Sequence, residues 1–557
     1  MDHAPPPDTH YQTNALSLAY LTTEKTNALT KNLSQVMHED CMRGLELLHQ
    51  ADFAILDGFT VFAQNHLPML HKLVKQKFAE GGRCFLVGSG SSGRVSIDLA
   101  AKSTKRKVIG VIAGGDSAFI RAREGFEDSE KDGRAALKSC HLTPHDIVFL
   151  ISASGSASFN IGAAQEAKEA GATVCYFYNS SQVPANTQSL FDAHGVIPVL
   201  VDIGPQAITG STRLQAASLA ELCLGCLLSE ESPDELIQAL KDGNQKIKDH
   251  FKEISQIIQL EYETFSDPQA NFRRLKDETA QGYVTFVAGK DALREVMIDT
   301  TETSPTFSTN PPRTLAEAGK KKAEFQACMA KEKDNLKAWQ SLIGRKVNPE
   351  HLQDVEQFVI SEHAFNMRST GKGNLVIGVA KEKHKHLLPS LDQARKNGAR
   401  TAMVCISDKA IAQNIKTGCD AAVFLEGIKK DRFGIVPTIL LKQMLNMISN
   451  GSMVLMNKVD GNQMIDVNAS NKKLIDRAVR LIQDIFSRYR PDATVHYDTL
   501  QQMVLHIREK KKEYEQKNIY TPSPVKIGVT MIQKGLDFDN AVEFLHAHRE
   551  ELQKVFL

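Results

Sequence analysis

Short apolar runs alternate with helical patterns along the first half of the chain, and this alternation constrains the fold more than any other feature. Each run has the length of a buried strand, and stretches such as 160–170 carry apolar residues at helical spacing between the runs. Strands that alternate with helices predict a doubly wound α/β domain with a parallel sheet. The predicted strands are Cys84–Val87, Val108–Ala113, Ile147–Ile151, Thr173–Tyr178 and Val196–Val201.

A second alternation follows residues 230–280, a charged helical stretch that we interpret as a connector. The chain is therefore expected to hold two tandem doubly wound parallel-sheet domains, with a charged helical region after them. The second set of predicted strands is Val284–Ala288, Asn374–Ala380, Ala402–Ile406 and Ala421–Leu425. The predicted boundaries are an N-terminal tail and leading helix at 1–50, a first α/β domain at 51–260, a second at 261–490 and a C-terminal helical domain at 491–557.

Composition and charge argue against several classes of protein. The 557 residues are 42% hydrophobic and 24% charged, and 67 basic against 66 acidic residues give a net charge of +1. This balance provides no electrostatic basis for binding nucleic acid or a membrane surface. No apolar run approaches the roughly 20 residues that span a bilayer. The N-terminal sequence MDHAPPPDTHYQ has neither a basic region nor an apolar core, so we expect a cytoplasmic protein without a secretory signal.

The nine cysteines are scattered, which indicates a reducing compartment. Cys223 and Cys226 form a CxxC pair, but they lie in the apolar sequence LAELCLGCLL, which predicts a buried helix. No second pair supports a zinc site. We therefore expect neither a metal nor a cofactor.

The turn between Val87 and Val95 is the first candidate binding site. It holds only glycine and serine until Arg94, and it follows a predicted strand and precedes a predicted helix. Glycines allow close backbone approach, and the unpaired N–H groups and dipole of a helix start favour an anion. The turn is neither a Walker loop nor a complete dinucleotide fingerprint. The predicted phosphate-binding residues are Gly90, Ser91, Ser92 and Gly93, with Arg94 orienting the turn.

Two further serine-rich loops precede predicted helices. The segment 152–159 contributes Ser154 and Ser156, and the segment 204–213 contributes Ser211. Ordinary helix capping by serine and threonine is the alternative interpretation. The corresponding turn of the second half, VAGKDALREV, lacks this richness in glycine and serine. One half of the chain is therefore expected to bind an anion and the other is not.

Several motifs together resemble the sugar isomerase (SIS) domain family. Within it, the chain is most similar to N-acetylmuramic acid 6-phosphate etherases and to their fused relative, the glucokinase regulatory protein, which has two SIS domains and a C-terminal helical lid. The motifs that carry the resemblance are LTTEKTNALTKNL at 21–33, VGSGSSGR at 87–94, IAGGDSAFIRAREGFEDS at 112–129, GPQAITGSTR at 204–213 and NGSMVLMNKVDGNQMIDVNASNKKL at 450–474.

The resemblance implies a set of functional residues. Glu127 lies at the position of an acidic catalytic residue, and Lys458 lies at that of a ligand-contacting lysine. The sequence DTTETSPTF is similar to the family's DASECPPTF and places Glu302 at a second catalytic position. In a dimer-like arrangement Glu302 faces the ligand held by the first domain. Two carboxylates can then act as base and acid in releasing lactate from a sugar phosphate.

Departures from the family pattern keep three functions open. Lys102 stands where the first domain of an etherase has its catalytic glutamate, and Ser156 stands where an etherase has arginine. Gln206 and Gln215 replace a glutamate and a lysine. The resemblance thus implies either a lyase acting on N-acetylmuramic acid 6-phosphate, or a non-catalytic sensor of a ligand such as fructose 6-phosphate that binds a sugar kinase. An aldose–ketose isomerase is the third reading.

Overall fold

A computed structural model gives the fold of most of the chain. The N-terminal tail at 1–19 and the end of the connector at 267–281 lie outside the described residues. The structure describes residues 20–103, 107–123, 125–266, 282–307, 309, 312, 314–317, 325–363, 370–382, 385–411, 418–467, 469, 472–492, 495–517 and 519–557.

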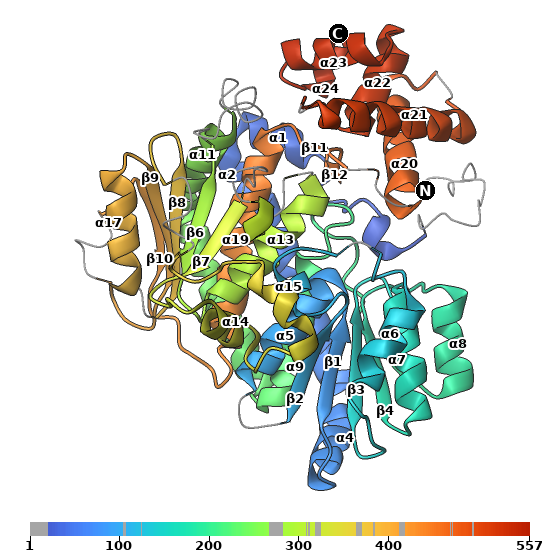
Figure 1. The fold of residues 1–557 in the computed structure, drawn as a ribbon, viewed down its shortest axis with the longest axis vertical. Helices are drawn as coiled ribbons and strands as arrows, with labels where there is room; N and C mark the ends of the chain where they lie inside the picture. The colour runs from blue at the N-terminus through green and yellow to red at the C-terminus, as the bar shows by residue number, and fades with distance from the viewer. Residues whose placement is uncertain are drawn as a thin grey trace, which may run out of the picture.

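Two five-stranded parallel sheets form the centre of the molecule (Figure 1), which confirms the predicted fold class. The strand orders are β2-β1-β3-β4-β5 and β10-β9-β8-β6-β7, so both sheets have one topology. The strands are β1 (Cys84–Gly88), β2 (Val108–Ile112), β3 (Ile147–Ser152), β4 (Thr173–Tyr178), β5 (Ile197–Leu200), β6 (Val284–Ala288), β7 (Phe325–Met329), β8 (Leu375–Lys381), β9 (Arg400–Ile406) and β10 (Ala421–Leu425). A short hairpin, β11 (Val459–Asp460) and β12 (Gln463–Met464), follows them.

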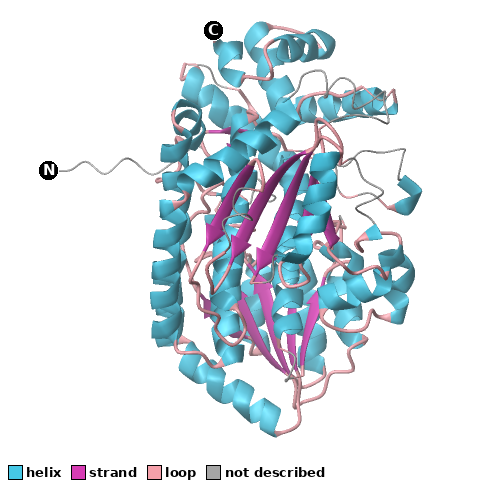
Figure 2. Cartoon of the chain, turned by 90° about the vertical axis from the view of Figure 1, so that its left-hand side faces the viewer, coloured by secondary structure: helices cyan, strands magenta, loops and turns pink. Residues whose placement is uncertain are grey.

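Helices cover the sheets and join them (Figure 2). The first part of the chain contains α1 (Leu33–Glu39), α2 (Cys41–Phe53), α3 (Ile55–Asn65), α4 (Leu67–Ala79), α5 (Gly90–Lys102), α6 (Glu130–Lys138), α7 (Ser158–Glu169), α8 (Ala185–His194), α9 (Gln215–Ser229), α10 (Pro233–Asp249) and α11 (Phe251–Ser266). The second part contains α13 (Leu293–Phe307), α14 (Asn335–Ile343), α15 (Leu352–Glu356), α17 (Leu388–Lys396) and α19 (Ile435–Leu455). Short 3-10 helices are η1 (Thr22–Glu24), η2 (Asp116–Phe119), η3 (Leu315–Glu317), η4 (Pro349–His351) and η5 (Lys385–Leu387).

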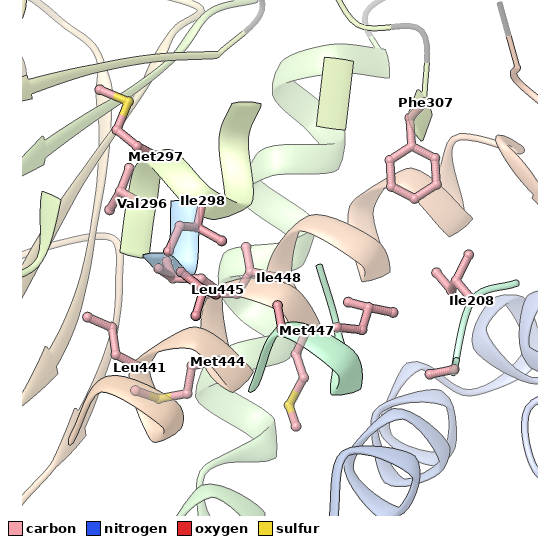
Figure 3. Close-up of a cluster of buried hydrophobic side chains, with 14 of the residues drawn as sticks. Ile208, Val296, Met297, Ile298, Phe307, Leu441, Met444, Leu445, Met447 and Ile448 are labelled. Carbon is pink, nitrogen blue, oxygen red and sulfur yellow. The ribbon is translucent and has the colours of Figure 1, made fainter. Parts of the chain in front are cut away.

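The helices α9 and α19 are buried almost all round, because they lie between the two sheet units (Figure 1). A helix that is apolar on every face needs such a position. Cys223 and Cys226 belong to α9 and are buried there. Figure 3 shows α13 against α19, with Ile298 next to Leu445 and Ile448. The interface of the two units is therefore part of the main hydrophobic core.

The C-terminal helices form a separate layer at the end of the molecule where the chain ends (Figure 1). They are α20 (Lys472–Tyr489), α21 (Tyr497–Gln516), α22 (Pro524–Lys534), α23 (Phe538–Ala547) and α24 (Leu552–Phe556). The chain breaks between α22 and α23, where Gly535 has a φ of +65° and Asp537 caps α23 through the N–H of Asn540. Within the described part of the chain, no helix combines the length and the apolar character needed to cross a bilayer.

Candidate functional site

The turn between β1 and α5 is tightly closed. Gly88 ends β1, and Gly90 opens α5 with a φ of +50°. A Cβ atom on Gly93 would lie 2.6 Å from the carbonyl oxygen of Gly88, so a side chain at this position has no room. The glycines therefore let the first N–H groups of α5 approach a ligand closely.

Two serine hydroxyls of this turn have no partner among the described residues. The Oγ atoms of Ser89 and Ser91 are buried and make no hydrogen bond, and Ser91 is only 4% exposed. Buried polar groups in proteins are nearly always hydrogen-bonded, so each exception calls for an explanation. Unused donors at the start of a 13-residue helix fit an anionic ligand.

The serine loop after β3 lies at the same edge of the sheet. Gly88 pairs with Ile151 in the parallel register, so both loops leave the sheet at neighbouring carboxyl ends. The Oγ atoms of Ser154 and Ser156 are 2.7 Å apart, and both side chains are partly exposed. The N–H of Gly155 donates to the Oγ of Ser152 at 3.0 Å, which orders the loop.

Glu302 reaches this turn from the second unit, on α13. Its Oε1 forms an ion pair with Nη1 of Arg94, and the same oxygen would lie 3.3 Å from a Cβ on Gly90. Arg94 is fully buried and also donates to the carbonyl oxygens of Phe119 and Ala118, at 3.0 and 2.7 Å. The structure therefore brings together Gly90, Arg94 and Glu302, and Arg94 ties the turn to the loop after β2.

Glu127 makes no hydrogen bond or ion pair with Arg94 or Glu302 in the described part of the chain. It is exposed, and its carboxylate makes no hydrogen bond or ion pair with another described residue. Its carbonyl oxygen accepts from the N–H of Phe159 at 2.9 Å, which places it beside the start of α7. Glu127 thus borders the loop that carries Ser154 and Ser156.

Lys458 follows α19 and contacts the end of α13. Its Nζ donates to the carbonyl oxygen of Phe307 and to Oδ2 of Asp466, both at 2.6 Å. Lys526 of the C-terminal helices lies 3.4 Å from the other oxygen of Asp466. Burial raises the pKa of Asp466, but the charges of Lys458 and Lys526 outweigh it and lower the pKa to about 2.

The loop at 204–213 is closed by two amides. Oε1 of Gln206 accepts from the N–H of Ala216 at 3.0 Å, and Oε1 of Gln215 accepts from the N–H of Ala207 at 3.1 Å. Both glutamines are buried, where neutral amides avoid the desolvation cost of charged side chains. Ser211 in this loop is 1% exposed, and its Oγ has no hydrogen-bond partner in the described chain.

Lys102 is buried at the far end of α5, away from the turn. Its Nζ contacts Asp98 and donates to Glu221 at 2.7 Å and to Thr438 at 3.0 Å. Lys381 donates to Glu295 at 2.6 Å and to the same Thr438 at 3.0 Å. The position that departs from the etherase pattern therefore holds an internal counter-ion.

Sequence reasoning missed the contact between Arg213 and Asp299. Both residues stand in quoted motifs, at the end of GPQAITGSTR and three residues before Glu302, but neither was assigned a role. They form a buried ion pair between the two units. The signal available in the sequence was a charged residue flanked by apolar or small residues in each motif.

Comparison of the sequence with family models and with known proteins finds similarity to proteins with SIS domains. Residues 67–168 match the model described as the glucokinase regulatory protein N-terminal SIS domain. An N-acetylmuramic acid 6-phosphate etherase of Exiguobacterium sp. is 33% identical over 216 residues, which cover 37% of this chain and 69% of that protein. The enzyme of the same name from Halalkalibacterium halodurans is 31% identical over 246 residues, which cover 42% of this chain and 79% of that protein.

The solved structures that are similar to this chain are more distant in sequence. Tagatose-6-phosphate ketose/aldose isomerase from Escherichia coli is similar with a TM-score of 0.47 and 11% identity, over 78% of this chain and 96% of that chain. The C-terminal domain of glucosamine-fructose-6-phosphate aminotransferase from Francisella tularensis has a TM-score of 0.38 and 12% identity, over 74% of this chain and 96% of that chain.

Proposed function

We propose, because this chain belongs to the N-acetylmuramic acid 6-phosphate etherase family, that it binds a 6-phosphorylated amino sugar at the turn between β1 and α5. The observation that carries the proposal is the turn itself, where Ser91 is buried with an unused hydroxyl and Glu302 arrives from the second unit. The phosphate is assigned to the N–H groups of α5 and to Ser91 and Ser92. Serines of the adjacent loops, Ser154, Ser156 and Ser211, and the ammonium of Lys458 complete the proposed set.

The proposed reaction is removal of the lactyl ether as lactate. One carboxylate takes the proton from C2 of the ring-opened sugar, next to the C1 carbonyl, and the C2–H electron pair forms a C2–C3 double bond as the C3–O ether bond breaks. The other carboxylic acid gives a proton to the departing lactyl oxygen, and water then adds to the double bond at C3. Glu127 and Glu302 are the proposed pair. Their surroundings differ, since Glu302 contacts a guanidinium whereas Glu127 is exposed.

The direct test is release of D-lactate from N-acetylmuramic acid 6-phosphate by the purified chain. Wild-type protein is expected to release lactate, and Glu127→Gln is expected to lower kcat by about 10²–10⁴-fold while still binding the substrate. Glu130→Gln, an exposed acid at the start of α6, is the matched control and is expected to retain full activity. A folded wild-type chain that binds the sugar phosphate and releases no lactate would overturn the etherase proposal.

A second candidate is a non-catalytic sugar-phosphate sensor that binds a sugar kinase. The match of residues 67–168 to the glucokinase regulatory protein model favours it, as does the charge reversal at Lys102. Inhibition of a hexose kinase by this chain, strengthened by fructose 6-phosphate, is the expected result. Lack of any ligand-dependent effect on the kinase would contradict the sensor.

An aldose–ketose isomerase is the third candidate, and unchanged fructose 6-phosphate after incubation would exclude it.

A further inference from the structure

The helix α13 must be held accurately for Glu302 to act at a turn that belongs to the other unit. Its core face packs on α19 through apolar side chains (Figure 3). Apolar packing fixes the distance between two helices better than it fixes their rotation or sliding, because it is non-directional. Directional contacts near Glu302 are therefore of interest, since a displacement of about 1 Å can cost about 100-fold in rate.

Three residues of one helical turn contact the first unit. Asp299 forms an ion pair with Arg213, and Glu302 forms one with Arg94. The hydroxyl of Thr301 donates to the carbonyl oxygen of Ile120 at 2.9 Å. Residues three apart lie on neighbouring positions of a helix surface, so Asp299 and Glu302 address the first unit from the same side.

Arg213 is held from several directions. It is 1% exposed, and its Nη1 donates to the hydroxyl of Ser449 at 3.0 Å while its Nη2 donates to Oδ1 of Asn450 at 2.6 Å. The hydroxyl of Ser449 in turn donates to Oδ1 of Asp299 at 3.0 Å. Lys442 holds the backbone of Arg213 by bonding its carbonyl oxygen. The guanidinium thereby ties the loop at 204–213 to α13 and α19 together.

We propose that Arg213 and Asp299 are positioning residues, which form a clamp across the two units and hold α13 so that Glu302 stays at the turn between β1 and α5. The proposal rests on the proposed function, because Glu302 is taken as one of its two carboxylates. Neither Arg213 nor Asp299 belongs to the proposed phosphate-binding set, although Arg213 lies in the loop that carries Ser211. Loss of the clamp is therefore expected to affect turnover more than phosphate binding.

The test compares Asp299→Asn with Thr300→Val in the lactate assay. Thr300 is the matched control, because it is the next residue of α13 and its hydroxyl bonds only within the helix, to Val296. Asp299→Asn is expected to lower kcat by about 30–100-fold, with KM and the Kd for the sugar phosphate within about threefold. Thr300→Val is expected to keep kcat within about twofold. Arg213→Lys, which keeps the charge but loses the two-armed contact, is expected to fall between them.

The variants are expected to fold, because Arg213 keeps neutral hydrogen-bond acceptors when Asp299 is changed. Its guanidinium still donates to the hydroxyl of Ser449 and to Oδ1 of Asn450. Unchanged kcat in folded Asp299→Asn, or an equal fall in Thr300→Val, would overturn the clamp. If wild-type protein releases no lactate, the proposed reaction fails and the clamp is decided by the crystal structure of Asp299→Asn. Loss of the contact between Arg94 and Glu302 would then support it, and an unchanged contact would refute it.

Discussion

The turns that begin α5 and α13 occupy equivalent places in two sheets of one topology, yet they differ in what fills them. The first turn holds glycine and serine, and among the described residues outside the turn's own backbone a Cβ placed on Gly90 would meet Oε1 of Glu302 at 3.3 Å. In the second turn, a Cβ on Gly289 would meet Oδ1 of Asp291 at 2.7 Å and Nε2 of His386 at 2.8 Å. Among the described residues, side chains of the chain itself crowd the second turn at Gly289 more closely than the first turn at Gly90.

The charged side chains around the two turns also differ. At the first turn, Arg94 donates to the carbonyl oxygens of residues 118 and 119 and forms an ion pair with Glu302. At the second turn, Arg294 donates to the carbonyl oxygens of residues 341 and 342 and forms an ion pair with Asp98. The arginines are thus equivalent, but only the second turn adds a buried lysine, Lys102, next to its carboxylate. A counter-ion supplied by the protein satisfies charges that a ligand would otherwise meet. From this difference we predict one ligand site for each chain.

The largest effect is expected from Glu302, the carboxylate of α13 that contacts the first turn. Glu302→Gln is expected to lower kcat for lactate release by about 10²–10⁴-fold, because an amide neither takes nor gives the proton. Glu295→Gln is the matched control, with the same substitution on the same helix at the second turn. It is expected to change kcat by less than about threefold. Equal losses in the two variants would contradict the assignment of chemistry to the first turn.

The next effect concerns Lys102, which ends α5 and lies beside the second turn. Lys102→Met is expected to lower the free energy of unfolding by about 3–5 kcal/mol, since it removes the ammonium that pairs with the buried side chains of Asp98 and Glu221. Urea denaturation at pH 7 measures this change. The folded variant should still bind the sugar phosphate with the affinity of the wild type. Unchanged stability would show that the charges around Lys102 do not support the fold.

The stability of the protein is also expected to depend on pH through Glu221 of α9, which pairs with Lys102 beside the second turn. Burial raises the pKa of Glu221 from 4.5 to about 8, although Lys102 acts in the opposite direction. The folded state therefore binds more protons than the unfolded state between these values, and the contribution of Glu221 to stability falls as pH rises through this window. Glu221→Gln is expected to remove a loss of about 2 kcal/mol between pH 6 and pH 8. Urea titrations with the same slope in both proteins would refute this.

The smallest effect is expected from a single hydroxyl of the first turn. Ser91→Ala is expected to weaken binding of the sugar phosphate about fivefold, which corresponds to about 1 kcal/mol for one hydrogen bond. Ser103→Ala is the matched control, because Ser103 caps the other end of α5 and its Oγ is also buried without a partner in the described structure. Equal affinities of the two variants, measured by calorimetry, would argue against a phosphate at Ser91.

Much of the fold was predictable from local sequence, because strand runs and glycine turns are local signals. The strand β7 was missed, since its run FQACM is short, contains Gln326 and follows the charged sequence KKKAE. The approach of Glu302 to the first turn was expected from the family resemblance. The role of Arg213 was not predictable, because its partner Asp299 lies 86 positions away and buried charges have no local pattern. The functional roles of the site residues stay predictions.

The number of sugar-phosphate molecules bound by one chain tests the central claim most directly. Isothermal titration of the catalytically blocked Glu302→Gln protein with N-acetylmuramic acid 6-phosphate measures this number without turnover. The expected result is one molecule for each chain, with binding weakened by Ser91→Ala and unaffected by Ser103→Ala. Two molecules for each chain, or one whose affinity is the same in Ser91→Ala and in the parent protein, would contradict the assignment of the site to the first turn.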